Sequence, residues 1–231
     1  MTDGFELIPV ELGAGHVEVR LLDLIGLGNL ESVAAEYLTS SETAEYAELR
    51  HPLRRREWLG ARVCLKLMVM QQGRVGAPRQ CTVLKDPSGR PRLVFAPEST
   101  AGVVGDCSLS HKGRFACAAT SSAAGAKIGV DIEEVSPRLR RLAGQFAHER
   151  DTLLGSRPAE ERLAILWALK EACSKVGGRG LAMALRTVTC QEIAPGRHRV
   201  VTGELELSGR HTVHEGYVIA LCFGTDQSVE S

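Results

Sequence analysis

The sequence predicts an α+β fold with two similar halves, each a long helix packed on a small antiparallel sheet. Each half contains one strongly helical run, followed by short apolar runs that turn residues separate. Overlaying the two helical runs gives the pattern W-x5-C-x-K twice, and a His-x-Gly turn before an aromatic residue recurs near the end of each half. We therefore expect a duplicated unit, with halves at residues 1–122 and 123–231 and the active site in the cleft between them.

The first half is expected to open with a short strand and to continue with two helices and a set of hairpins. The first helix covers Ser41–Leu49, with Ser40 or Ser41 as its cap and acidic residues in its first turns. The second helix covers about Arg54–Met70, where apolar side chains recur at helical spacing. From Cys81 to Thr120 the short apolar runs between turn residues predict strands and hairpins.

The second half is expected to repeat this order after a small, polar linker at Thr120–Ala126. The helix that carries the repeated pattern ends at the pair Gly177-Gly178, because glycine is the usual residue after a helix. The expected elements are a strand over Ile128–Glu133, helices over Leu139–Leu154 and Pro158–Val176, and strands near Thr187–Gln191, Arg199–Leu207 and Tyr217–Phe223.

Composition and charge argue against several classes of protein. The chain has 28 Lys and Arg against 28 Asp and Glu, so its formal net charge is zero, whereas a general binder of nucleic acids needs uncompensated cations. No window approaches about 18 consecutive apolar residues, and the amino terminus carries acids where a secretory signal carries bases. We therefore predict a cytoplasmic protein that binds neither nucleic acid nor membrane.

The cysteines predict core packing and not a metal or disulfide framework. The seven cysteines include no C-x-x-C pair and have mostly aliphatic neighbours. A zinc site would need close pairs, and a disulfide framework favours an even count in a shorter chain. We expect reduced cysteines that serve as small core residues.

The run from Ile128 to Glu133 places two carboxylates on one face of a strand. Side chains alternate along a strand, so Asp131 and Glu133 lie on the same face, about 6 to 7 Å apart, together with the small Gly129. Carboxylates beside open space suit a hard cation such as Mg²⁺, which completes its shell with water and phosphate. The alternative is that these acids simply lie on the wet face of an amphipathic strand.

The long helix of the second half carries a charged pair next to an aromatic residue. Residues four apart share one side of a helix, so Trp167, Glu171 and Lys175 lie in one row. If Trp167 faces the core, Glu171 lies at the edge of buried territory, and Lys175 can pair with it or with a bound anion. The alternative is an exposed Glu–Lys pair that contributes a few tenths of a kcal/mol.

The turn from Ser108 to Arg114 combines hydroxyl groups, an imidazole and two cations around Gly113. Such donors form a plausible phosphate site, although a hairpin turn without function has the same composition. A Ser–His catalytic pair is disfavoured, because adjacent residues of a strand point to opposite faces and no G-x-S-x-G elbow is present.

A group of arginines, Arg54 to Arg56 with Arg50 before them, lies at the start of the long helix of the first half. Cations at that end oppose the helix dipole, and a bound anion would relieve this cost. The group therefore predicts an anion site more readily than a nucleic-acid address.

The order of these motifs resembles a known family. A Ser-His turn, then G-V-D-I-E at Gly129–Glu133, then W-A-L-K-E-A-x-x-K from Trp167 to Lys175 and G-x-G-L from Gly178 is similar to the 4'-phosphopantetheinyl transferases of the surfactin-synthetase-activating (Sfp) type. The R-R-E-W-L-G-A-R helix and the Gly89–Pro91 turn also resemble that family, and the resemblance covers roughly Leu38–Phe223.

The resemblance implies an enzyme, a holo-[acyl-carrier-protein] synthase, that moves the phosphopantetheine arm of coenzyme A to a serine of an apo acyl or peptidyl carrier protein. Asp131, Glu133 and Glu171 would hold Mg²⁺, with Mn²⁺ as the alternative. Glu171 is also the candidate general base, although one carboxylate cannot fully serve as ligand and free base together. Lys175 would stabilise charge on the phosphates or the leaving group.

The resemblance also implies contacts to the nucleotide part of coenzyme A. Ser110 and His111 would contact its phosphates, with Arg56, Arg90 and Arg50 at the adenosine end. The chain departs from the family in Ser40–Leu49, which contains none of the lysines that relatives often carry, so the arginines would substitute for them. The chain is expected to act as a monomer, and the alternative function is a non-catalytic module that binds coenzyme A or a nucleotide.

Overall fold

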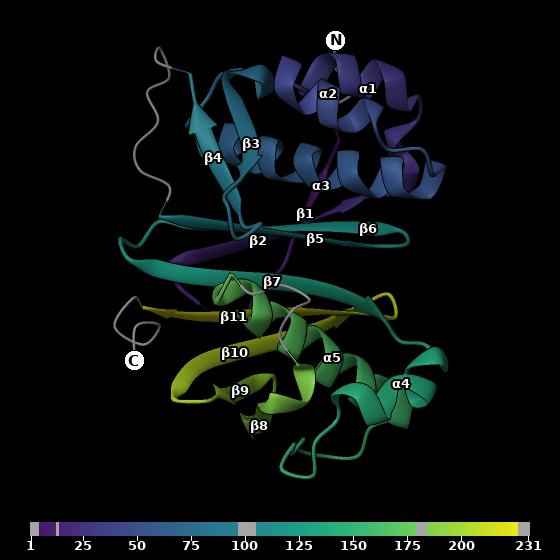
Figure 1. The fold of residues 1–231 in the computed structure, drawn as a ribbon, viewed down its shortest axis with the longest axis vertical. Coiled ribbons are helices and arrows are strands. Elements are labelled where there is room, and N and C mark those ends of the chain that lie inside the picture. Colours follow the sequence, from purple (N-terminus) through teal and green to yellow (C-terminus); the bar gives the residue numbers. More distant parts are fainter. Residues whose placement is uncertain (1–4, 13, 97–104, 179–183, 226–231) are drawn as a thin grey trace.

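The computed structural model, which describes residues 5–12, 14–96, 105–178 and 184–225, has four stacked layers. Figure 1 shows α1 to α3 covering the outer side of one sheet, α4 and α5 on the outer side of a second sheet, and the two sheets lying together between them. The predicted α+β class with two halves, each a long helix on an antiparallel sheet, is confirmed.

The first half contains one sheet with the strand order β1-β2-β6-β5 and a separate β3-β4 ribbon. The predicted second helix is α3, which begins two residues early because Pro52 fits the first helical position. The helix α2 begins at Ser40, and its cap is Thr39, whose N–H donates to Glu42 at 2.9 Å. The elements are β1 (Leu7–Pro9), β2 (Val17–Asp23), η1 (Leu24–Leu27), α1 (Leu30–Tyr37), α2 (Ser40–Ala47), α3 (Pro52–Gln71), η2 (Pro78–Gln80), β3 (Cys81–Lys85), β4 (Pro91–Phe95), β5 (Asp106–Lys112) and β6 (Phe115–Ser121).

The second half contains a sheet with the strand order β7-β11-β10-β9-β8, packed against α5. Its elements are β7 (Ala126–Glu134), α4 (Arg138–Phe146), α5 (Ala159–Val176), η4 (Leu185–Thr187), β8 (Val188–Ala194), β9 (Arg197–Thr202), β10 (Leu205–His214) and β11 (Tyr217–Thr225). Since β6 ends at Ser121 and β7 begins at Ala126, the boundary between residues 122 and 123 falls in the connection, and it stays a prediction.

Two predicted elements of this half are wrong. The helix expected over Leu139–Leu154 ends at Phe146, because Asp151 binds the Lys170 ammonium and the backbone N–H of Cys190, which holds the following segment as a loop against β8. The strand expected over Arg199–Leu207 is interrupted at Gly203, whose φ of +59° forms a turn, so β9 and β10 are two strands.

Three apolar cores separate the layers. One lies between α3 and the first sheet, and another between α5 and the second sheet. The third lies between the sheets, where residues of β2 and β6 such as Leu21 and Cys117 pack with residues of β7 and β11 such as Val130 and Leu221. All seven cysteines are free and buried, which confirms their predicted role in the core.

The internal repeat appears most clearly in two hairpin turns. Gly113 joins β5 to β6 with a φ of +54°, and Gly216 joins β10 to β11 with a φ of +79°. The helix overlay is less faithful, because it pairs Lys66 with Lys175. Lys66 is fully buried, and its ammonium donates to a carboxylate and to backbone carbonyls. In α5 the lysine with this environment is Lys170 and not Lys175. Within the part of the chain that the structure covers, no helix is long and apolar enough to cross a membrane.

Candidate active site

The strands β5 and β7 from different halves lie side by side, joined by side chains of β5. A carboxylate oxygen of Asp106 accepts from the N–H of Ile128 at 2.8 Å, and the hydroxyl of Ser108 accepts from the N–H of Val130 at 3.0 Å. The hydroxyl of Ser110 then donates to Oδ1 of Asp131 at 2.7 Å. These bonds bring the polar turn of the first half to the acids of the second.

The two acids of β7 and the acid of α5 form an acidic cluster, defined as Asp131, Glu133 and Glu171. Their exposed fractions are only 7%, 8% and 8%, so they do not lie on a wet strand face. Gly129 explains why the helix can cover this face, since a Cβ there would lie 2.0 Å from the Ala172 carbonyl oxygen. The small residue lets α5 rest on β7 and places Glu171 beside the strand acids.

The electrostatics of the cluster favour a bound cation. Burial and then the charge of Asp131 raise the pKa of Glu171 to about 7, against the opposing effect of Lys175. Burial also raises the pKa of Glu133, opposed by Lys112. Among the described residues, none donates a hydrogen bond to the Glu171 carboxylate. A buried carboxylate without a donor is a costly arrangement that a divalent cation would relieve.

Lys175 pairs with the strand acid and not with its helix neighbour Glu171. Its ammonium donates to Oδ1 of Asp131 at 2.8 Å and to the carbonyls of Val130 and Leu109 at 2.9 and 3.2 Å. The exposed Glu–Lys helix pair considered as the alternative is therefore wrong. Lys175 connects α5 to both β7 and β5.

The end of β5 and the turn that follows it make contacts that the sequence did not predict. Nζ of Lys112 lies 2.6 Å from Oε1 of Glu133. Glu57 of α3 accepts from the N–H of Gly113 at 3.0 Å, and its other oxygen lies 3.4 Å from Nδ1 of His111. Burial lowers the pKa of His111, so its imidazole is neutral near pH 7. Glu57 lies in the R-R-E-W run, but only the fold reveals its partner.

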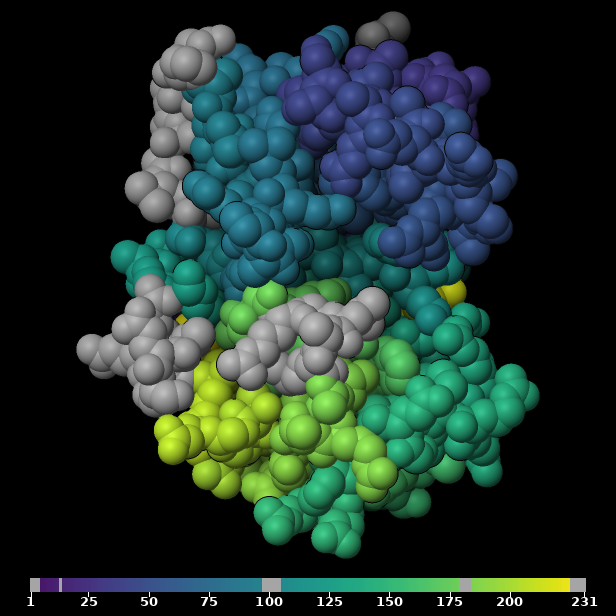
Figure 2. Space-filling view, in the orientation of Figure 1, coloured from purple at the N-terminus to yellow at the C-terminus, as the bar shows by residue number. Residues whose placement is uncertain are grey.

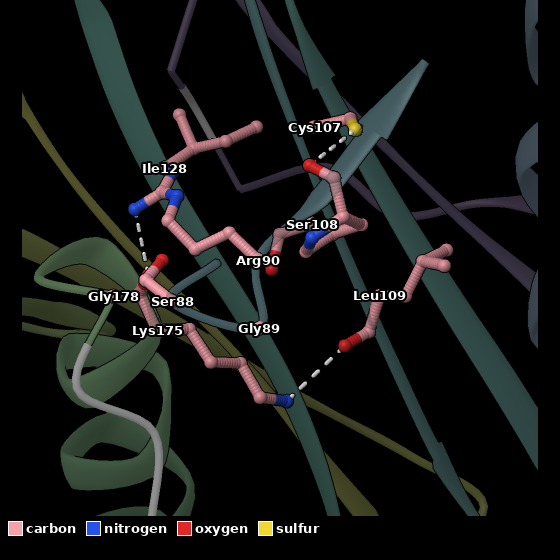
Figure 3. Close-up of a pocket in the computed structure, with 10 residues that line it drawn as sticks. Ser88, Gly89, Arg90, Cys107, Ser108, Leu109, Ile128, Lys175 and Gly178 are labelled. Atoms are coloured by element: carbon pink, nitrogen blue, oxygen red, sulfur yellow. Dashed lines mark hydrogen bonds between the residues drawn. The ribbon is translucent and has the colours of Figure 1, made fainter. Parts of the chain in front are cut away.

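Arg90 lies at a cavity of about 200 Å³ between the halves. Its guanidinium donates to the carbonyl of Lys175 at 2.7 Å and to that of Val176, and it pairs with Asp106. Figure 3 shows Arg90 reaching the end of α5 while Lys175 points toward Leu109. In Figure 2 atoms of the first half, in blue, lie directly on those of α5, in green. The lining residues are Ser88, Gly89, Arg90, Pro91, Cys107, Ser108, Leu109, Ile128, Lys175 and Gly178.

The other two predicted nucleotide contacts lie elsewhere. Arg50 is exposed just before α3. Arg56 lines a second hollow of about 360 Å³ beside Gly113 and Arg114, and not the cavity that Arg90 lines. Their roles stay predictions. In the G-x-G-L motif, Arg179, Gly180 and Leu181 lie outside the described residues.

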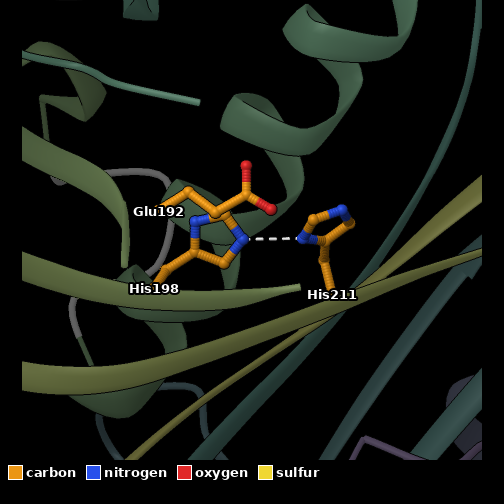
Figure 4. A group of neighbouring side chains, drawn as sticks. All are labelled: Glu192, His198 and His211. Carbon is orange, nitrogen blue, oxygen red and sulfur yellow. Dashed lines mark hydrogen bonds between the residues drawn. The ribbon is translucent and has the colours of Figure 1, made fainter. Parts of the chain in front are cut away.

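A second polar cluster, formed by Glu192, His198 and His211, was not predicted from the sequence. Its ligand atoms lie within 4.8 Å of one another, but both carboxylate oxygens of Glu192 already accept bonds from Arg157 and from the N–H groups of Leu154 and Gly196. Nε2 of His198 and Nδ1 of His211 share a hydrogen bond of 2.6 Å, which is drawn in Figure 4. The two imidazoles therefore form a hydrogen-bonded pair, and the carboxylate of Glu192 beside them already accepts hydrogen bonds at both of its oxygens.

This imidazole pair predicts a loss of stability in acid. Burial, then His211, and to a smaller extent Arg157 and Arg210 lower the pKa of His198 from 6.5 to about 4. Burial and then Arg157 also lower the pKa of His211. The unfolded chain therefore takes up protons near pH 6.5, before the folded chain does. The contribution of His198 to stability should be full above that pH and fall toward pH 4, by up to about 1.4 kcal/mol per pH unit, and His211 acts in the same direction.

Urea unfolding at several pH values checks this expectation. His198→Leu should flatten the slope in the acid range, and replacing the exposed His16 with Gln should leave it unchanged. An equal slope in the His198→Leu variant and the wild type would show that the pair does not control acid stability.

Parts of the chain are similar to known proteins. Residues 127–222 match the family model of the 4'-phosphopantetheinyl transferase superfamily. The chain is 38% identical over 88 residues to the 4'-phosphopantetheinyl transferase psf-1 of Bacillus pumilus, which is 36% of each protein. It is 26% identical over 161 residues to slr0495 of Synechocystis sp., provisionally named as a 4'-phosphopantetheinyl transferase, over 67% of this chain and 63% of that one.

Both relatives are thus matched over less than two thirds of their own length. Among solved structures, the holo-[acyl-carrier-protein] synthase of Thermotoga maritima is similar over 62% of this chain and 77% of its own, with 23% identity and a TM-score of 0.38.

Proposed function

We propose that this chain is a 4'-phosphopantetheinyl transferase, as the match of residues 127–222 to that superfamily suggests, and that it transfers the 4'-phosphopantetheine group of coenzyme A to a serine of an apo acyl or peptidyl carrier protein. The observation that carries the proposal is the acidic cluster beside Lys175 and Ser110, built from both halves of the chain. The serine oxygen forms a bond to the phosphorus that bears pantetheine. The bond from that phosphorus to adenosine 3',5'-bisphosphate breaks, and the serine proton passes to a base.

The donor set of the cluster fits a divalent cation. Asp131, Glu133 and Glu171 offer carboxylate oxygens, the ligands that Mg²⁺ and Mn²⁺ prefer, and Glu171 has no hydrogen-bond donor from the described chain. A bound Mg²⁺ would neutralise charge on the pyrophosphate and help to orient the bond that breaks.

The residues around the cluster have separate tasks in this proposal. Glu171 serves as metal ligand or accepts the serine proton, for which a pKa of about 7 is well placed. Lys175, fixed by Asp131 and two carbonyls, stabilises charge on the phosphates or the leaving group. Ser110 and the neutral His111 contact the phosphates, and Arg90, Arg56 and Arg50 contact the adenosine end.

The cavity beside Arg90 supports this assignment as one part of a coenzyme site. Its volume of about 200 Å³ is below the usual range for a whole ligand pocket, so it would hold only a portion of coenzyme A. In the finer assignment the chain acts as a monomer in the cytoplasm and catalyses the holo-[acyl-carrier-protein] synthase reaction.

The direct test mixes purified protein with coenzyme A, Mg²⁺ and an apo carrier protein. We expect the mass of the carrier to rise by one phosphopantetheine group, with release of adenosine 3',5'-bisphosphate. Several acyl and peptidyl carriers are compared, because acceptor choice is part of the proposal. Unchanged masses for all of them would contradict transfer, and binding of coenzyme A without release of the bisphosphate would identify a binding module.

A further inference from the structure

Two of the three acids in the acidic cluster form ion pairs with lysines of the same chain. Lys175 pairs with Asp131 at 2.8 Å, and Lys112 pairs with Glu133 at 2.6 Å. The two lysines are held differently. Lys175 also donates to two backbone carbonyls, whereas the ammonium of Lys112 has Glu133 as its one partner among the residues that the structure describes. The Lys112 side chain is 27% exposed, so it can leave this partner without losing other bonds.

The Lys112–Glu133 pair occupies an oxygen that a divalent cation would need. The ammonium of Lys112 lies on Oε1 of Glu133 and takes up part of its capacity to donate electron pairs, and the ammonium charge repels an incoming cation at short range. The Glu133 side chain is only 11% exposed, so screening by solvent is weak there. The pair therefore opposes metal binding at Glu133.

We propose that Lys112 is an internal competitor for the metal at Glu133. In the free protein it lowers the affinity of the acidic cluster for a divalent cation. The main ligands left are Glu171 and Oδ2 of Asp131, because Lys175 and Ser110 both donate to Oδ1 of Asp131 and no described residue donates to its Oδ2. The proposal rests on the proposed function in one respect, namely that the pyrophosphate of coenzyme A is the ligand that relieves this competition. A bound pyrophosphate offers Lys112 new acceptors and releases Glu133, so coenzyme and metal strengthen each other's binding.

Titration with Mn²⁺ alone tests the competition, with the free ion measured by its electron paramagnetic resonance signal. Lys112→Ala should tighten Mn²⁺ binding about tenfold or more, because it frees Glu133 and removes a nearby charge. Lys112→Arg should keep the wild-type affinity. Lys85→Ala is the matched control, because Lys85 is 57% exposed and pairs with Glu45, outside the cluster.

A double-mutant cycle identifies Glu133 as the contested ligand. Glu133→Gln should change Mn²⁺ affinity less than about threefold in the wild type, but remove the whole gain in the Lys112→Ala background. If Lys112→Ala keeps its native circular dichroism and binds Mn²⁺ no more tightly, the proposal is wrong. An equal cost of Glu133→Gln in both backgrounds would overturn it as well. If Lys112→Ala did not fold, Lys112→Gln would remove the same charge and decide the question.

The result is separable from the proposed function, because no coenzyme or carrier is present in this titration. Tighter Mn²⁺ binding by the Lys112→Ala variant of a chain that transfers nothing would support the competition and contradict the transfer. Transfer activity with an unchanged Mn²⁺ affinity would support the function and overturn the competition.

Discussion

Glu171→Gln is expected to lower the rate of phosphopantetheine transfer by about 10² to 10⁴, the range that a general base contributes. The substitution keeps the size of the side chain but removes its charge and its ability to accept a proton. The fold should not suffer, because burial raises the pKa of Glu171 to about 7 and its charged form is therefore disfavoured in the folded state. Above that pH the Gln variant should be at least as stable as the wild type. Single-turnover rates and urea unfolding measure the two effects.

The same variant separates the two roles considered for Glu171. If Glu171 is a metal ligand, Mn²⁺ affinity falls together with the rate; if it acts only as a base, the rate falls at an unchanged affinity. Glu160→Gln on the same helix is the matched control, since Glu160 pairs with Arg140 away from the cluster and its loss should leave transfer unchanged. Full activity of Glu171→Gln would contradict the assignment of this residue to the reaction.

The parts of the fold that follow from local patterns were predictable, and those that depend on distant partners were not. The helix expected from Arg54 to Met70 is present as α3, because its apolar spacing and Pro52 act within the segment itself. The helix expected through Leu154 fails beyond Phe146, where Asp151 binds Lys170 and Cys190. No local pattern reveals those two partners.

In the site, too, the features that follow from local patterns were predictable and the contacts between distant residues were not. Strand alternation correctly placed Asp131 and Glu133 on one face, toward the helix that carries Glu171. Helix spacing suggested Glu171 as the partner of Lys175, but the packing of α5 on β7 presents Asp131 instead. The contact of Glu57 with His111 joins residues of separate elements, and only the tertiary structure reveals it.

Glu42→Ala is expected to lower the free energy of unfolding by about 3 to 5 kcal/mol, the usual cost of removing one partner of a buried ion pair. Glu42 and Lys66 are 1% and 0% exposed, and their charged atoms lie 2.7 Å apart. Glu42 also accepts from the N–H groups of Thr39 and Val83, at 2.9 and 3.1 Å. Its removal would leave a buried ammonium without its counter-ion and two backbone donors without an acceptor.

Urea unfolding measures this loss, with Glu206→Ala as a control, because the exposed pair of Glu206 with Arg199 contributes little to stability. The double variant Glu42→Leu with Lys66→Met should be more stable than Glu42→Ala, because it removes both buried charges together. A loss below about 1 kcal/mol in Glu42→Ala would show that Lys66 does not depend on its carboxylate. The second half contains a comparable buried pair, Lys170 with Asp151, whose side chains are 0% and 3% exposed. A small loss in Glu42→Ala would mean that such a lysine–carboxylate pair does not stabilise either half.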